Sequence, residues 1–112
     1  MVSPTVGSVV LVRFPFSDLS ATKLRPAAVL AAVDRDDWIL CQITSNPYAD
    51  TKAVEIIQSD FSSGSLSRVS YARPGKLFTA SNAIMEKEVG LLTSAKTSSV
   101  IKAVIALLEP KR

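Results

Sequence analysis

Three observations predict the fold of this chain, a small and partly open β barrel with one C-terminal helix. Short runs rich in valine and isoleucine recur along most of the sequence, and clusters of turn-forming residues separate them. Near the C-terminus, apolar residues recur at helical spacing instead. The chain has 112 residues, of which 47% are hydrophobic and 21% charged, so it is long enough for one folded domain and too short for two. We therefore expect a single, mainly β domain over residues 1–112.

The first strands are expected over residues 8–14, 26–33 and 38–44. Pro15 ends the first strand because proline has no N–H to donate to a sheet. Residues 15–23 are mostly polar and turn-forming, so they predict a loop longer than a tight hairpin needs, and a loop of that length is a candidate for function. The charged turn at residues 34–37 joins the second and third strands as a hairpin.

The second half alternates short strands with turns before a terminal helix. We expect a break at residues 45–47, a short strand at 53–57, a loop at 62–65, mixed strand and turn at 69–79, and a last strand at 87–92. Ser81 is positioned to cap a short helix, and Thr93 or Ser94 to cap the terminal one. On that helix the residues with helical spacing are Val100, Ile101, Val104, Ile105 and Leu108, and Pro110 marks its end. This face is expected to cover the sheet.

Composition excludes several classes of site. The chain has no histidine and one cysteine, so a zinc site is not expected and we predict no metal. Cys41 has no partner for an intrachain disulfide, and its apolar setting predicts a buried thiol, which fits a reducing cytoplasm. The apolar run near Lys102 is too short to span a membrane, and no signal peptide is visible. The net charge of +3 leans toward polyanionic partners without deciding the function.

An arginine stands directly before a proline at the start of the second apolar run, as Arg25 and Pro26. The proline ring pushes the residue before it toward extended geometry. Arg25 is therefore predicted to be held extended where a loop meets a strand, with a guanidinium that is able to bind a phosphate through two parallel hydrogen bonds. The alternative is an ordinary solvated arginine, or one paired with an acid such as Asp18.

An ordered set of motifs covers nearly the whole chain. It consists of VLVRFPFSDLS at residues 10–20, KLRPAAVL at 23–30, QITS at 42–45, DF at 60–61, SYARPGKLFT at 70–79 and GLL at 90–92. This set resembles the MazF/PemK family of toxin–antitoxin endoribonucleases. The resemblance implies an SH3-like, partly open barrel that forms a homodimer.

The resemblance also implies an activity. Family members cut single-stranded RNA, including mRNA, without a metal or cofactor and thereby inhibit growth. The RNA 2'-hydroxyl attacks the neighbouring phosphate, which leaves a cyclic phosphate and a 5'-hydroxyl end. The implied protein partner is a cognate antitoxin, whose disordered acidic tail would occupy the RNA groove and with which the toxin binds DNA.

The resemblance maps the catalytic pair onto Arg25 and Thr44. A fixed guanidinium beside a hydroxyl donor suits the negative charge that gathers on the phosphate oxygens during attack. Because arginine stays protonated, we assign Arg25 as charge stabiliser and proton donor, and leave the general base unassigned. The alternative for Thr44 is a hydroxyl at a strand end that caps the turn at residues 45–47.

The RNA-binding residues implied by the resemblance lie in three segments. They are Phe16, Ser17, Asp18 and Lys23 in the first loop, Ser45 and Asn46 after the third strand, and Arg73 and Lys76 in the later strand. Phe16 is a candidate for stacking on a base, or else a core or dimer contact. The same two readings stay open for Tyr48, whereas Trp38 is expected to pack at a hairpin end. Some relatives use an aspartate and a histidine in catalysis, but here Gly75 stands at the aspartate position.

Two other functions compete with the nuclease. A toxin of the same fold that binds DNA gyrase without catalysis is one, but such relatives end their helix in TrpGlyIle, whereas this chain ends LEPKR at residues 108–112. The other is an inactive relative that binds RNA or protein without cutting, because small errors in geometry abolish catalysis.

Overall fold

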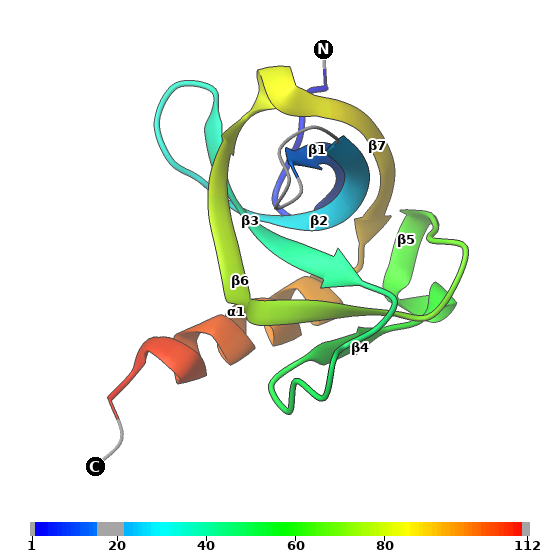
Figure 1. The fold of residues 1–112 in the computed structure, drawn as a ribbon, viewed down its shortest axis with the longest axis vertical. Coiled ribbons are helices and arrows are strands. Elements are labelled where there is room, and N and C mark those ends of the chain that lie inside the picture. Colours follow the sequence, from blue (N-terminus) through cyan, green and yellow to red (C-terminus); the bar gives the residue numbers. More distant parts are fainter. Residues whose placement is uncertain (1, 16–21, 111–112) are drawn as a thin grey trace.

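One antiparallel sheet and one long helix make up the fold in the computed structural model, which describes residues 2–15 and 22–110. The elements are β1 (Ser8–Pro15), β2 (Thr22–Ala32), β3 (Asp37–Thr44), β4 (Val54–Ile56), η1 (Gln58–Asp60), β5 (Phe61–Gly64), β6 (Ser70–Ser81), η2 (Asn82–Ile84), β7 (Met85–Leu92) and α1 (Ser94–Leu108). The strands follow the order β4-β6-β3-β2-β1-β7-β5, and β6 and β7 curl around β1 and β2 (Figure 1). The predicted mainly β, partly open barrel with a C-terminal helix is confirmed.

The central strands are buried on both faces. Successive side chains of a strand point to opposite faces, so Val9 and Val10, or Ala27 and Ala28, enter different cores. One core, lying under α1, contains Val9, Ala28, Leu30, Cys41, Ile43, Ile56, Ala72, Leu92, Val100 and Val104. The other contains Val10, Val12, Ala27, Val29, Leu40, Ala80 and Met85, with Trp38 and Phe78 packed against it. This arrangement explains why the strands read as unbroken apolar runs rather than as alternating patterns.

Helix α1 covers the sheet with only part of its predicted apolar face. Thr93 caps its first turn by accepting a hydrogen bond from the Lys96 N–H at 3.2 Å. Val100 and Val104 are buried, but Ile105 is 46% exposed and Leu108 70% exposed, so the prediction that these two cover the sheet is wrong. The reason is that the last turn stands off the sheet, so that Ile105 and Leu108 line an open apolar groove of about 220 Å³ with side chains of β2, β3 and β6. No helix in residues 2–15 and 22–110 is long and apolar enough to cross a membrane.

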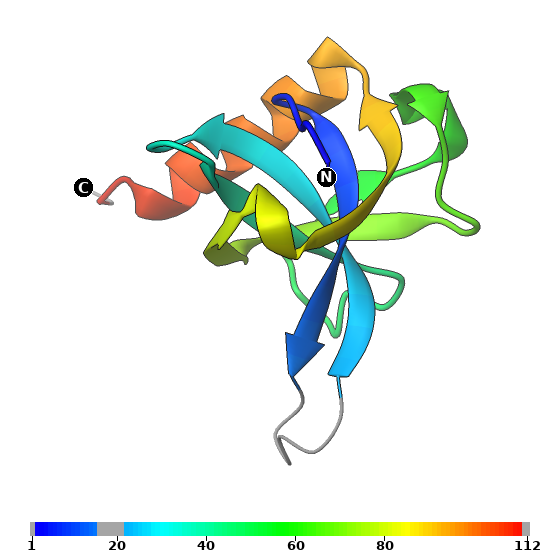
Figure 2. The ribbon, with the colours of Figure 1, turned by 90° about the horizontal axis from the view of Figure 1, so that it is seen from above.

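Strand β2 begins earlier than its apolar run predicts. It pairs with β1 from Ala28 opposite Val9 to Thr22 opposite Pro15. Figure 2 shows the outer ends of β1 and β2 side by side, reaching beyond the rest of the sheet. Because backbone pairing requires no apolar side chains, the polar residues before Pro26 join the ladder. Arg25 therefore lies inside a strand, opposite Val12, and not at the junction of a loop and a strand.

Two further expectations are corrected in the second half of the chain. Residues 62–65 are predicted to form a loop, but the strand β5 (Phe61–Gly64) lies there and pairs with the end of β7. Residues 69–79 were expected to mix strand and turn, but β6 is continuous through Pro74. Its register against β3 jumps between Leu77 and Ala72, so the residues between them form a bulge in which a proline costs no ladder bond. The thiol of Cys41 donates to the carbonyl of Arg73 in this bulge, at 3.1 Å.

Candidate active-site cleft

A polar cleft of about 440 Å³ lies where the start of β2, the end of β3 and the segment before β6 meet. Its described lining combines three cations, several hydroxyls and a few apolar side chains. The lining residues are Leu11, Lys23, Leu24, Arg25, Pro26, Ile43, Thr44, Ser45, Asn46, Tyr48, Leu66, Ser67, Arg68 and Ser70. Five of the residues predicted as catalytic or RNA-binding are thus brought together, namely Lys23, Arg25, Thr44, Ser45 and Asn46.

The pairing of β2 with β3 explains why Arg25 and Thr44 reach the same cleft. In this antiparallel pair Ala27 lies opposite Gln42. The ladder between the two strands ends at this pair, and Arg25 on β2 and Thr44 on β3 each lie two residues beyond it, at the same end of the two antiparallel strands. Arg25 is half-buried and Thr44 is 8% exposed. The start of one strand and the end of its neighbour therefore define one wall of the cleft.

Thr44 holds the backbone that follows it. Its Oγ1 accepts a hydrogen bond from the Asn46 N–H at 3.1 Å and donates to the Asn46 carbonyl at 3.0 Å. The turn cap that the sequence offered as an alternative is therefore present. The same hydroxyl lines the cleft, so it is able to donate to a ligand by exchanging its bond to the Asn46 carbonyl.

The loop after Thr44 is fixed by its own side chains. The Asn46 side-chain oxygen accepts from the Tyr48 N–H at 3.0 Å, and the Asp50 N–H donates to the carbonyl of Pro47 at 2.9 Å. Asp50 binds the Arg73 Nε through its second carboxylate oxygen at 3.0 Å, in an ion pair of which each side chain is at most 20% exposed. The hydrogen bond from Arg73, followed by one from the Lys52 N–H, lowers the pKa of Asp50 below its ordinary value.

Arg73 and Lys76, predicted to bind RNA, do not line this cleft. The Arg73 guanidinium is taken up by Asp50 and lies over the Tyr48 ring, 5.7 Å from its centroid. Lys76 lines a separate shallow hollow with Gln42, Leu77 and Phe78. The predicted residues Phe16, Ser17 and Asp18 lie outside the described residues.

Arg68 is a cleft residue that the sequence did not single out. It stands in the segment between β5 and β6 and lines the cleft with Lys23 and Arg25. No aspartate or glutamate of the described chain lines the cleft. Three cations without a carboxylate suit a phosphate or another anion. In the sequence Arg68 follows a serine-rich stretch, where it resembles any solvated arginine, and only the fold brings it beside Arg25.

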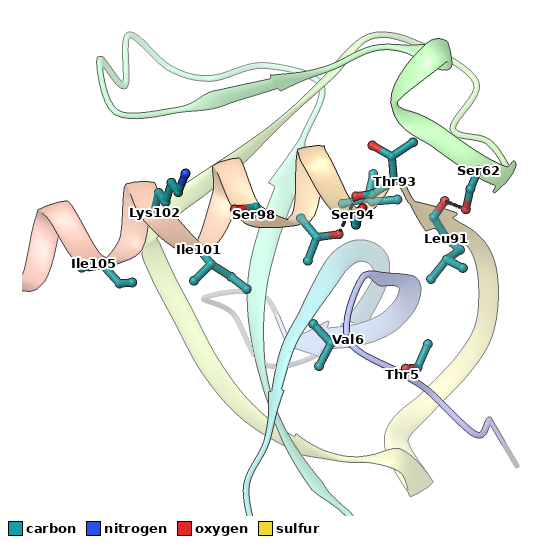
Figure 3. A pocket seen from close by; sticks show the side chains of 12 residues that line it. Thr5, Val6, Ser62, Leu91, Thr93, Ser94, Ser98, Ile101, Lys102 and Ile105 are labelled. Atoms are coloured by element: carbon teal, nitrogen blue, oxygen red, sulfur yellow. Dashed lines mark hydrogen bonds between the residues drawn. The ribbon is translucent and has the colours of Figure 1, made fainter.

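A larger hollow, of about 870 Å³, runs beside α1. Figure 3 shows Ile101 and Ile105 on α1 and Val6 on the N-terminal segment among its lining side chains, and Ser62 donates a hydrogen bond to the Leu91 carbonyl at 3.2 Å. Of the predicted catalytic and RNA-binding residues that the structure describes, none lines this hollow. Lys102 is the one charged residue of the described part of the chain that lines this hollow, so the hollow offers fewer charged groups to a ligand than the polar cleft does. Among residues 2–15 and 22–110, no three His, Cys, Asp or Glu side chains are grouped to hold a metal.

Comparison with known proteins identifies the fold. No protein-family model matches the sequence, and no curated protein sequence is similar to it. Solved structures do match. A MazE–MazF complex from Deinococcus radiodurans gives a TM-score of 0.74 at 15% identity, over 94% of this chain and 95% of that one.

Two mycobacterial structures match over similar lengths. An endoribonuclease from Mycobacterial species, in complex with its cognate antitoxin, gives a TM-score of 0.72 at 17% identity, over 98% of this chain and 100% of that one. A MazF toxin of Mycobacterium tuberculosis gives 0.70 at 14% identity, over 94% of this chain and 99% of that one. The resemblance read from the sequence motifs is thus confirmed at the level of the fold, and this chain has the fold of the MazF toxins.

Proposed function

We propose that this chain is a metal-independent endoribonuclease toxin of the MazF/PemK family, which cuts single-stranded RNA at the polar cleft. The observation that carries the proposal is the meeting of Arg25 and Thr44 in a cleft that is lined by two further cations and, among residues 2–15 and 22–110, by no carboxylate. RNA is a polyanion, and a cleft that offers only cations and neutral donors binds its backbone without electrostatic repulsion. The fold shared with MazF structures supports the same assignment.

The chemistry follows from the side chains of the cleft. The 2'-hydroxyl gives up its proton as its oxygen attacks the adjacent phosphorus, the bond from phosphorus to the 5'-oxygen breaks, and the departing 5'-oxygen takes up a proton, so that the numbers of protons released and consumed are equal. Charge gathers on the non-bridging oxygens during this step. The Arg25 guanidinium binds those oxygens, and the Thr44 hydroxyl donates a hydrogen bond to one of them. A well-placed donor of this kind is worth about 3 kcal/mol in other enzymes.

Arg68 and Lys23 have a different role in this scheme. Phosphate contacts position a nucleic acid without reading its sequence. Since both cations line the cleft beside Arg25, we assign them to the phosphates that flank the scissile one. The backbone of the RNA is thereby fixed on both sides of the reacting bond.

The proposal includes two protein partners. Two of the three structures described above are complexes with a second protein, namely the MazE–MazF complex and the endoribonuclease with its cognate antitoxin. We propose a cognate antitoxin with an acidic segment for this chain as well, because such a segment matches the charge of the cleft. We further propose that the toxin acts as a homodimer on cytoplasmic mRNA.

The test is incubation of the purified protein with a long single-stranded RNA in excess EDTA, beside Arg25→Ala and the surface variant Lys102→Ala. We expect discrete cuts with 5'-hydroxyl ends for the wild type and for Lys102→Ala, and a loss of about 100-fold or more for Arg25→Ala.

Three results would overturn parts of the proposal. Cleavage by Arg25→Ala within about tenfold of the wild type removes the catalytic assignment, because that factor equals only about 1.4 kcal/mol of barrier. Activity that disappears in EDTA and returns with magnesium removes the metal-independent mechanism. A folded protein that cuts no RNA under any of these conditions removes the nuclease assignment itself.

A further inference from the structure

Tyr48 is an exposed aromatic residue of the polar cleft. It lines the cleft with Arg25 and Thr44, and 63% of its surface is open to solvent. A large ring left this exposed gains little from burial, so packing gives no reason for its place. Its two faces also differ, because the Arg73 guanidinium lies over the ring at 5.7 Å from the centroid.

The backbone that presents this ring is strained. Tyr48 has a φ of 53° and Ala49 a φ of 61°, and both are residues for which left-handed backbone is unfavourable. Two such residues in succession persist only where the surroundings hold them, and strain of this kind is concentrated at functional sites. Here the surroundings are the hydrogen bond from the Tyr48 N–H to Asn46 and the shielded ion pair of Asp50 with Arg73.

These features fix both the ring and its support. Asp50 orients Arg73 through the Nε bond at 3.0 Å, and Arg73 backs the ring through a cation–π contact. The loop also begins at Thr44, whose hydroxyl binds the backbone of Asn46. The position of the ring is therefore tied through the loop to the proposed catalytic hydroxyl.

We propose that Tyr48 is a base-stacking residue, which holds the base of a nucleotide next to the cleaved phosphate against its ring, with Arg73 and Asp50 as positioning residues. The ligand is a single-stranded RNA base of any identity, since every base has a face to stack and the ring offers it no patterned set of hydrogen bonds. The inference rests on the proposed function, since it takes the polar cleft as the RNA site.

The experiment measures binding of a short single-stranded RNA, made resistant to cleavage by 2'-O-methyl groups, using fluorescence anisotropy. Tyr48→Phe keeps the ring and should bind within about twofold of the wild type. Tyr48→Leu keeps apolar bulk and the same backbone demands but lacks the flat face, and should bind about tenfold more weakly, as stacking on one base is worth roughly that factor. Thermal unfolding of each variant confirms that it is folded.

A second set of RNAs locates the stacked base. Each of these RNAs lacks the base at one position. For the RNA that lacks the stacked base, the wild type and Tyr48→Leu should bind with the same affinity. Equal binding of Tyr48→Leu and wild type to intact RNA would overturn the proposal, and so would a tenfold loss that persists at every abasic position. Binding is measured on RNA that cannot be cut, so this experiment and the cleavage test on unmodified RNA can fail separately. Weaker binding by Tyr48→Leu, together with no cleavage of unmodified RNA by the wild type, would refute the nuclease alone. Cleavage by the wild type, together with equal binding by Tyr48→Leu and the wild type, would refute the stacking alone.

Discussion

Removing one cation from the cleft should change how RNA binding depends on salt. Lys23, Arg25 and Arg68 line the cleft, and no described carboxylate does. Each phosphate neutralised on a single strand contributes about 0.7 to the slope of log K against log salt. Three such contacts predict a slope of about −2 for each cleft, so affinity should fall roughly 20-fold between about 50 and 200 mM salt.

The variant that tests this reasoning is Arg68→Ala. We expect it to reduce the magnitude of the slope by about 0.7, because one phosphate contact is lost. Lys102→Ala removes the same charge from α1, outside the cleft, and should leave the slope unchanged. The assay is fluorescence anisotropy of a cleavage-resistant RNA at four or more salt concentrations. Slopes that fall equally in both variants would show that net charge and not the cleft sets the affinity, and an unchanged slope in Arg68→Ala would remove that residue from the site.

Three further predictions concern stability. Thr44→Val should lower the free energy of unfolding by about 1 kcal/mol in urea titration, because the Asn46 N–H loses its acceptor; no change would mean that the turn does not need this cap. Gly64→Ala should cost at least about 2 kcal/mol, since Gly64 has a φ of +68° and a Cβ there would lie 2.1 Å from the Val89 carbonyl oxygen; a wild-type melting temperature would contradict this. Burial raises the pKa of Cys41 from 9.0 to about 12, so between these two pH values the thiol ionises only in the unfolded chain. Stability should be intact below about pH 9 and then fall by up to about 1.4 kcal/mol per pH unit, relative to Cys41→Ala; parallel pH profiles of the two proteins would contradict it.

The strands and helix that carry strong local signals were predictable from the sequence. β3 and the hairpin it forms with β2 follow from two apolar runs around a charged turn. The caps at Ser81 and Thr93 lie where their hydroxyls accept from the N–H groups of Ala83 and Lys96. In each case the cause is local, because a side chain acts on backbone within a few residues.

The errors arise where distant segments decide the structure. Pro74 reads as a turn residue, yet it is fully buried within β6 because the bulge opposite β3 accepts a residue without an N–H. Ile105 and Leu108 continue a helical apolar pattern, but the last turn stands off the sheet and leaves an open apolar groove beneath them. Neither outcome is encoded in the neighbouring residues, since each depends on where another strand runs or ends.

The candidate site divides in the same way. From the residues alone, the strand-rich class could be predicted, and the order of the motifs marked Arg25 and Thr44 as a candidate pair. Only the tertiary structure brought Arg68 from a remote segment into the cleft, and engaged Arg73 with Asp50 behind the Tyr48 ring. The physical reason is that strand pairing converts sequence separation into spatial contact through its register, and a register is a property of two segments together.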